Sequence, residues 1–408
     1  FDIPLLIGGA TTSRMHTALR IAPAYGTGVV HVKDASRAVG VVQTLISAEK
    51  RAGFLEETAR DFEALRVRHQ QRQDTTHWLT LAEARARKFK PDWTAQAIAA
   101  PRQPGIHVMN DYPLAELVPY IDWTPFFMTW ELAGKYPRIL EDAIVGEAAR
   151  RLYEDARQML NEIVAGKWLR AAGVIGLFPA NSVGDDDLEI YTDATRTGIR
   201  ATLHMLRQQQ LRPEGQPNLS LADFIAPRES GHADHIGMFA VTAGLGIEQK
   251  LEEFARSHDD YSAILLKALA DRLAEALAEC MHERVRREFW GYAVAETLGS
   301  EELIAEKYQG IRPAPGYPAC PDHTEKLTLW QVLGVEERLA MKLTDSLAMY
   351  PAASVSGWYF AHPEARYFGV GRINRDQVQD YAQRKGMEIR RMEGWLSPLL
   401  GYDPDTLN

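Results

Sequence analysis

One short segment combines an arginine with residues that stiffen the backbone. "GIRPAPGYPACPDHTEK", residues 310–326, holds Arg312 and four prolines. The prolines fix φ and lack an N–H, which predicts neither helix nor central strand. Arg312 could bind a carboxylate through its planar guanidinium, and unused carbonyls could accept from an amine, as in a site for an amino-acid-like ligand. Equally, the segment could be a rigid loop over a core edge, with Arg312 in a structural ion pair.

A carboxylate lies among aromatic side chains in "YIDWTPFF", residues 120–127. Asp122 precedes a helical pattern with Pro125 in its first turn, which is typical of an N-cap. The same carboxylate could instead hold a cationic ligand. The residue types alone favour the N-cap interpretation.

Two small clusters contain side chains that can bind metals. His232, Asp234 and His235 lie in "SGHADHIG", and Cys320 and His323 share "CPDH". Neither cluster completes a four-ligand zinc set at a recognised spacing. We therefore predict no metal site.

The first 55 residues have the pattern of a parallel α/β domain. Short apolar runs at 3–9 and 28–33 alternate with helical patterns, as expected for the last part of a doubly wound sheet. The turn "GGATTS", residues 8–13, could hold an anion at a helix N-terminus, but it lacks a G-x-G-x-x-G fingerprint, which favours a simple tight turn. Residues 56–75 are charged and rich in glutamine, so a solvated helix or a linker is expected there.

Residues 76–408 predict an α+β domain with an antiparallel sheet and flanking helices. Strands are expected at 173–180, 188–193, 221–227 and 235–244, and a hairpin at 354–373. Long helices are expected within 135–165 and 259–290, and a capped helix within 374–386. The elements that must hold Asp122 and Arg312 therefore belong to this second domain.

Composition narrows the class of protein. The 408 residues are 46% hydrophobic and 25% charged, with a net charge of -9. An acidic chain does not have the basic footprint of a nucleic-acid partner, and no apolar run has the length of a membrane span. Two distant cysteines indicate no disulfide framework and fit a reducing cytoplasm.

The 310–326 segment closely resembles the S-adenosylmethionine-binding loop in the activation domain of cobalamin-dependent methionine synthases. Five further segments resemble the same domain, namely residues 120–140, 176–186, 258–279, 282–293 and 354–368. The resemblance covers roughly residues 75–408. "PLLIGGATTS" and "VKDASRAVGVV", within the first 55 residues, resemble the end of the cobalamin-binding domain of that family.

The resemblance implies roles for particular residues. For S-adenosylmethionine it implies Arg312, Gly316 and Tyr317 from an R-x-x-x-G-Y loop, with Ala314 between them, and it places Asp122 at the amino group of the ligand. It also implies that Glu275, Tyr367 and Phe368 line that site. For cobalamin it implies that Gly8, Gly9 and Ala35 lie near the nucleotide tail.

The family's activity implies a methyltransferase of methionine biosynthesis. Its activation domain supports reductive methylation of inactive cob(II)alamin, with S-adenosylmethionine as methyl donor and flavodoxin, in bacteria, as electron donor. Zinc belongs to other modules of such enzymes. Because the chain opens at Phe1 and contains no D-x-H-x-x-G cobalt-ligating motif, we expect a C-terminal fragment. We expect that it does not turn over homocysteine alone and that it binds cobalamin weakly or not at all.

A second class of function stays open. The chain could be a non-catalytic module that senses S-adenosylmethionine or docks flavodoxin. Methyl transfer to a cobalamin-loaded partner domain would distinguish the two. A free-standing methyltransferase with another acceptor is disfavoured, because no general base or acceptor pocket stands out.

Overall fold

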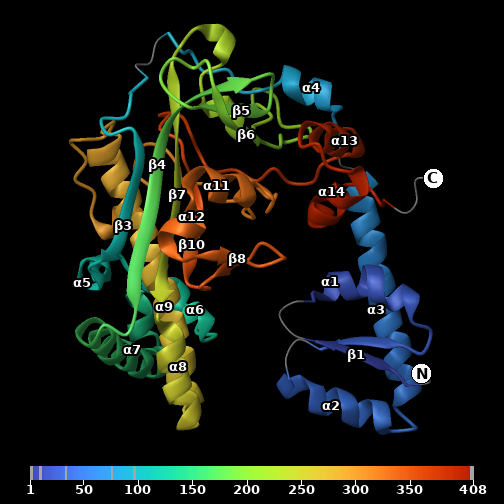
Figure 1. The fold of residues 1–408 in the computed structure, drawn as a ribbon. Coiled ribbons are helices and arrows are strands. Elements are labelled where there is room, and N and C mark those ends of the chain that lie inside the picture. Colours follow the sequence, from blue (N-terminus) through green and yellow to red (C-terminus); the bar gives the residue numbers. More distant parts are fainter. Residues whose placement is uncertain (1–2, 9–11, 33–34, 75–76, 95–97, 405–408) are drawn as a thin grey trace. The chain divides into compact units, whose positions relative to one another are not determined.

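The fold was analysed in a computed structural model, which describes residues 3–8, 12–32, 35–74, 77–94 and 98–404. The chain forms two compact units, Phe1–Trp78 and Leu79–Asn408 (Figure 1). Gly9, one of the residues implied for cobalamin, lies outside the described residues.

The first unit contains a parallel pair of strands, as the sequence predicts. β1 (Leu5–Gly8) pairs with β2 (Val29–Val32), with Leu5 opposite Val29. Small apolar clusters pack on this pair. Its helices are α1 Arg14–His16, η1 Thr17–Ile21, η2 Ala22–Ala24, α2 Ala35–Ile46 and α3 Arg51–Asp74.

Residues 56–75, expected as a solvated helix or a linker, are mostly helical in the structure. Most of that range belongs to α3, a 24-residue helix. Its Phe62 is 2% exposed and packs in one cluster with Ala18 and Val29. Partly buried Phe54, Leu55 and Leu65 of the same helix also pack on the first unit, so α3 is part of that unit.

The second unit is built on an antiparallel sheet with flanking helices, which confirms the predicted fold class. The strand order is β10-β7-β4-β5-β6, and β3 pairs with the first part of β4, on the same edge that β5 occupies further along. The strands are β3 Gly105–Tyr112, β4 Arg170–Val183, β5 Asp187–Tyr191, β6 Ile199–His204, β7 Asp234–Leu245 and β10 Ser354–Tyr359, with β8 Lys342–Leu343 and β9 Met349–Tyr350 as a separate pair.

Helices cover both faces of this sheet. The α-helices are α4 Leu81–Ala86, α5 Leu114–Leu117, α6 Trp123–Thr129, α7 Gly146–Gly166, α8 Ile247–Arg256, α9 Asp260–Arg284, α10 Ser300–Ile304, α11 Glu325–Leu333, α12 Val335–Leu339, α13 Arg375–Arg384 and α14 Ile389–Trp395. Shorter helical turns are η3 Val118–Tyr120, η4 Arg138–Glu141, η5 Leu221–Phe224, η6 Arg228–Ser230, η7 Val285–Phe289 and η8 Ser397–Leu399.

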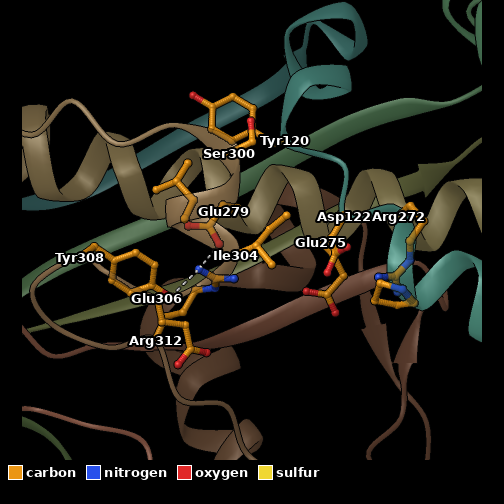
Figure 2. A pocket seen from close by; sticks show the side chains of 12 residues that line it. Tyr120, Asp122, Arg272, Glu275, Glu279, Ser300, Ile304, Glu306, Tyr308 and Arg312 are labelled. Carbon is orange, nitrogen blue, oxygen red and sulfur yellow. Dashed lines mark hydrogen bonds and ion pairs between the residues drawn. The ribbon is translucent and has the colours of Figure 1, made fainter. Parts of the chain in front are cut away.

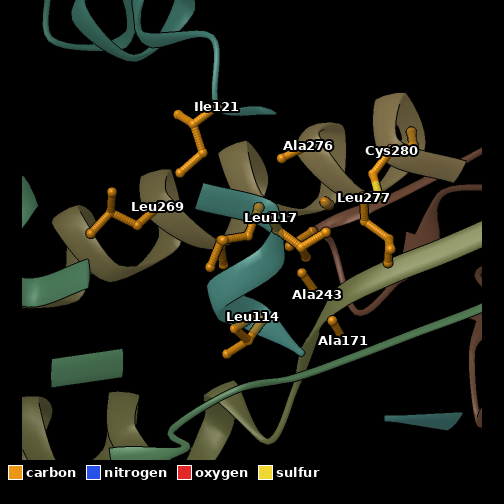
Figure 3. Close-up of a cluster of buried hydrophobic side chains, with 14 of the residues drawn as sticks. Leu114, Leu117, Ile121, Ala171, Ala243, Leu269, Ala276, Leu277 and Cys280 are labelled. Atoms are coloured by element: carbon orange, nitrogen blue, oxygen red, sulfur yellow. The ribbon is translucent and has the colours of Figure 1, made fainter. Parts of the chain in front are cut away.

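The central strand β4 is buried on both faces. Its successive side chains point to opposite faces of the sheet, and a core packs on each face. Ile175 packs in the core with α9, whereas Val174 packs in the core with α11 and α12. On the α9 face, Leu117 and Leu277 meet in a tightly packed cluster (Figure 3). This packing fixes α9 against the sheet.

Two predicted strands are absent from the described part of the second unit. The segment 221–227 contains the turn η5, whose first N–H groups are capped by Ser220. In the expected hairpin, β10 forms but pairs with β7 rather than with the residues that follow it. Those residues bond elsewhere, since the Val370 N–H donates to the Pro318 carbonyl at 2.8 Å.

No helix in the described residues combines the length and the apolar character that crossing a membrane requires.

Candidate functional site

A cavity of about 350 Å³ in the second unit brings together several charged side chains (Figure 2). In Figure 2, Arg312 and Glu279 lie on the left and Asp122 and Glu275 lie on the right. The lining consists of Tyr120, Asp122, Pro125, Arg272, Glu275, Glu279, Ser300, Leu303, Ile304, Glu306, Tyr308 and Arg312.

One face of α9 supplies three of these side chains. Arg272, Glu275 and Glu279 are spaced by three and four residues, so they lie on the same side of the helix. Buried residues such as Leu273 and Leu277 anchor α9 in the core. The helix therefore presents its polar stripe at a fixed position.

Asp122 both caps a helix and lines the cavity. It is the N-cap of α6, and its Oδ1 accepts a hydrogen bond from the Thr124 N–H at 2.9 Å. The N-cap interpretation is therefore confirmed. Within the described residues no hydrogen bond occupies Oδ2, so this oxygen can accept from a ligand.

Arg312 makes the structural ion pair that the sequence left as an alternative. Its Nη1 lies 2.7 Å from Glu279 Oε2, and the two side chains are 19% and 12% exposed. The same Nη1 lies 3.4 Å from the Tyr308 hydroxyl and from His282 Nδ1. Burial alone would lower the pKa of Arg312, but Glu279 and Tyr308 raise it above its usual value, so the guanidinium stays charged.

His282 closes the cluster behind Arg312. Its ring stacks on Tyr359 at 5.2 Å between centroids and meets Tyr308 edge-on at 4.8 Å. Complete burial, with Arg286 and Arg312 nearby, holds the pKa of His282 well below its usual value. The imidazole is therefore neutral beside Arg312.

The proline segment is less free than the sequence suggested. The expectation of unused carbonyls is wrong for Ile311, which exchanges two hydrogen bonds of 3.0 Å with Phe360, and for Pro313, whose carbonyl accepts from the Trp358 N–H at 3.0 Å. A Cβ on Gly357 would lie 2.4 Å from the Pro313 oxygen, so the two backbones touch. The segment extends the sheet past β10 as an edge, a place where proline is tolerated.

The remaining residues implied for the ligand lie outside the cavity lining. Gly316 has a φ of +96°, and a Cβ there would meet His323 at 2.2 Å, which explains the glycine. Tyr317 is 58% exposed. The Tyr367 hydroxyl accepts from the Arg312 N–H at 3.0 Å, and the expected second hairpin strand that would carry Tyr367 and Phe368 does not form.

Phe368 and Ala314 also have structural contacts. Phe368 packs beside Phe224, with ring centroids 6.5 Å apart, and Ala314 is 9% exposed. The Ala314 carbonyl accepts from the Tyr317 N–H at 3.1 Å, which closes the turn around Gly316. Of the implied residues, the structure thus gathers Asp122, Glu275 and Arg312 around one cavity.

Comparison with known proteins decides the family. Residues 113–386 match the family described as vitamin B12 dependent methionine synthase, activation domain. The chain belongs to this family. A solved structure of the MetH reactivation domain bound to AdoHcy is 56% identical in sequence and has a TM-score of 0.78. The match covers 80% of this chain and 100% of that chain. The second unit is therefore the reactivation module of a cobalamin-dependent methionine synthase.

Sequence reasoning missed several cavity residues of this activation domain. Glu279 follows Glu275 by one helical turn, and that spacing could have revealed it. Glu306 and Tyr308 come from the irregular segment before Arg312, which carries no periodic signal. Their positions depend on how that segment folds back over α9.

The described residues of this methionine synthase chain hold no group of three or more His, Cys, Asp or Glu side chains that could bind a metal. Asp234 instead accepts from the N–H groups of Ala226 and His235 at 2.8 and 2.7 Å. Cys320 is a buried free thiol. Cys320 packs in an apolar core, and His323 Nδ1 lies 3.1 Å from Lys326 Nζ, so both clusters have structural contacts.

In the first unit, the residues implied for cobalamin follow the two strands. Gly8 ends β1, and a Cβ there would lie 2.9 Å from the Val32 carbonyl oxygen. Ala35 begins α2, shortly after β2. Both positions are at the carboxyl ends of parallel strands, where open α/β sheets bind ligands.

Proposed function

We propose that the cavity binds S-adenosylmethionine as the methyl donor of reactivation. The observation that carries this proposal is that Arg312 and Asp122 line one cavity and each has unused bonding capacity. Within the described residues, Nε and Nη2 of Arg312 and Oδ2 of Asp122 make no hydrogen bond. A relative that is 56% identical is bound to AdoHcy, the demethylated form of this ligand.

The two residues would recognise the amino-acid part of the ligand. Arg312 donates from its free N–H groups to the carboxylate, and Asp122 accepts from the ammonium. Because Glu279 already holds Arg312, the guanidinium needs little rearrangement. The proposed contacts are completed by Glu275, Ala314, Gly316, Tyr317, Tyr367 and Phe368.

The role of this chain in methyl transfer is mainly to position the donor. When bound, cobalamin supplies a reduced cobalt nucleophile, formed with one electron from flavodoxin or an equivalent reductase. The sulfonium already carries a good leaving group, so holding the methyl group in line is what the protein contributes. The activity proposed is that of a methyltransferase domain, acting with the other domains of the enzyme.

The first unit fits the end of a cobalamin-binding domain. Gly8 presents no side chain at the carboxyl end of β1, and Ala35 begins the helix after β2. We propose that Gly8, Gly9 and Ala35 lie beside the nucleotide tail of cobalamin. Zinc is proposed only for other modules of the enzyme, and the cytoplasm as the compartment.

The test begins with calorimetry of S-adenosylmethionine binding. Arg312→Ala should weaken binding by about ten- to a hundredfold, the loss of one charge-assisted hydrogen bond. Unchanged affinity in the folded variant would remove Arg312 from the site. Methyl transfer to a cobalamin-loaded partner domain under reducing conditions then separates reactivation from ligand sensing alone, which would show binding without transfer.

A further inference from the structure

The charges around the cavity do not balance. Its lining contains four carboxylates and two guanidiniums, which leaves two negative charges in excess when all are ionised: Asp122, Glu275, Glu279 and Glu306 against Arg272 and Arg312. S-adenosylmethionine with its sulfonium, ammonium and carboxylate carries one net positive charge. The demethylated thioether product carries none.

Glu279 contributes its charge from a sheltered position. Its Oε2 pairs with Arg312, while its Oε1 is buried and has no hydrogen-bond partner in the described residues. The side chain is 12% exposed, so water screens it poorly. A charge in such surroundings acts across a cavity more strongly than one on the surface.

Arg312 neutralises the Glu279 carboxylate less completely when the ligand brings a carboxylate of its own. Because the proposed ligand carboxylate also binds Arg312, a single guanidinium then faces two carboxylates. The excess negative charge of the lining then favours a ligand that carries a further positive charge. The sulfonium is the group of S-adenosylmethionine that supplies it and that the product lacks.

We propose that Glu279 is a specificity-determining residue that makes the cavity prefer the cationic sulfonium to the thioether product. This inference rests on the proposed function. During transfer the methyl–sulfur bond breaks and its electron pair stays on sulfur, so the ligand left in the cavity is a neutral thioether with one positive charge fewer. The site therefore weakens its hold on the ligand as the reaction proceeds, which favours product release.

The experiment compares the affinities of three ligands by calorimetry at one ionic strength. S-adenosylmethionine and S-adenosylhomocysteine differ in the sulfonium charge, and sinefungin replaces the sulfonium with a carbon that bears an ammonium group. Glu279→Gln should reduce the preference for S-adenosylmethionine over S-adenosylhomocysteine by about three- to tenfold. The affinity for sinefungin should fall to the same extent as that for S-adenosylmethionine. Glu279→Asp keeps the charge and should keep the preference.

The matched control is Glu288→Gln, which removes the same charge from a side chain that is 52% exposed and pairs with Arg284, outside the cavity lining. It should leave the preference unchanged. If Glu279→Gln weakens both ligands equally, Glu279 only positions Arg312 and the inference is overturned. Failure of sinefungin to follow S-adenosylmethionine would also overturn it. If neither ligand binds the unmodified chain, the proposed function itself fails.

Discussion

Replacing Arg312 should destabilise the second unit even without ligand. Arg312→Met leaves the Glu279 carboxylate with neither oxygen hydrogen-bonded, since Oε1 already has no partner in the described residues and Oε2 loses its 2.7 Å contact. Breaking a buried ion pair in this way costs about 3–5 kcal/mol. Because both side chains keep some exposure, we expect about 3 kcal/mol. The double variant Arg312→Met with Glu279→Met removes both charges and should lie within about 1 kcal/mol of the unmodified chain.

Urea denaturation followed by tryptophan fluorescence measures this. Every tryptophan except Trp78 lies in the second unit, so the signal reports chiefly on that unit. The midpoint and slope give the free energy of unfolding. The reasoning is refuted if Arg312→Met costs less than about 1 kcal/mol, or if the double variant is as unstable as the single one, because either result means that the isolated carboxylate is not the source of the cost.

Three further changes test other parts of the structure. Asp122→Asn should keep the unliganded melting temperature, because asparagine caps as well as aspartate, yet weaken S-adenosylmethionine binding in calorimetry; lower stability with unchanged affinity would leave only the capping role. Gly357→Ala should cost about 1–3 kcal/mol of unfolding free energy by overpacking, since its Cβ would lie 2.4 Å from the Pro313 oxygen, and a neutral result would contradict that contact. Burial raises the pKa of Asp234 to about 6, so the stability that Asp234 contributes falls as the pH rises from about 4 to 6. Burial lowers the pKa of His235 to about 4, so the stability that His235 contributes falls as the pH drops from about 6.5 to 4. Because the two trends oppose each other, Asp234→Asn should make the unfolding free energy fall more steeply on acidification, by up to about 3 kcal/mol between pH 6.5 and 4. Urea denaturation at several pH values across that range measures this. If Asp234 does not titrate there, the dependence of unfolding free energy on pH will be unchanged.

The sequence was informative where local pattern and tertiary structure agree. The N-cap at Asp122 and the α9 helix follow from residue type and spacing. The expected hairpin at 354–373 does not form because β10 pairs with β7 instead. Pairing between strands so far apart in the sequence leaves no local signal. The ion pair between Glu279 and Arg312 joins positions 33 residues apart (312 minus 279), so single-sequence spacing could raise it only as an alternative.

The attachment of the proline segment to the sheet has a consequence for the thermodynamics of ligand binding. Ile311 and Phe360 hold each other through two hydrogen bonds, and the Arg312 N–H is bonded to Tyr367. The backbone that carries the guanidinium is thus ordered before any ligand arrives. Since ordering a residue costs about 1–2 kcal/mol of backbone conformational entropy, a preorganised segment spares the ligand that cost, and association need not wait for a loop to close.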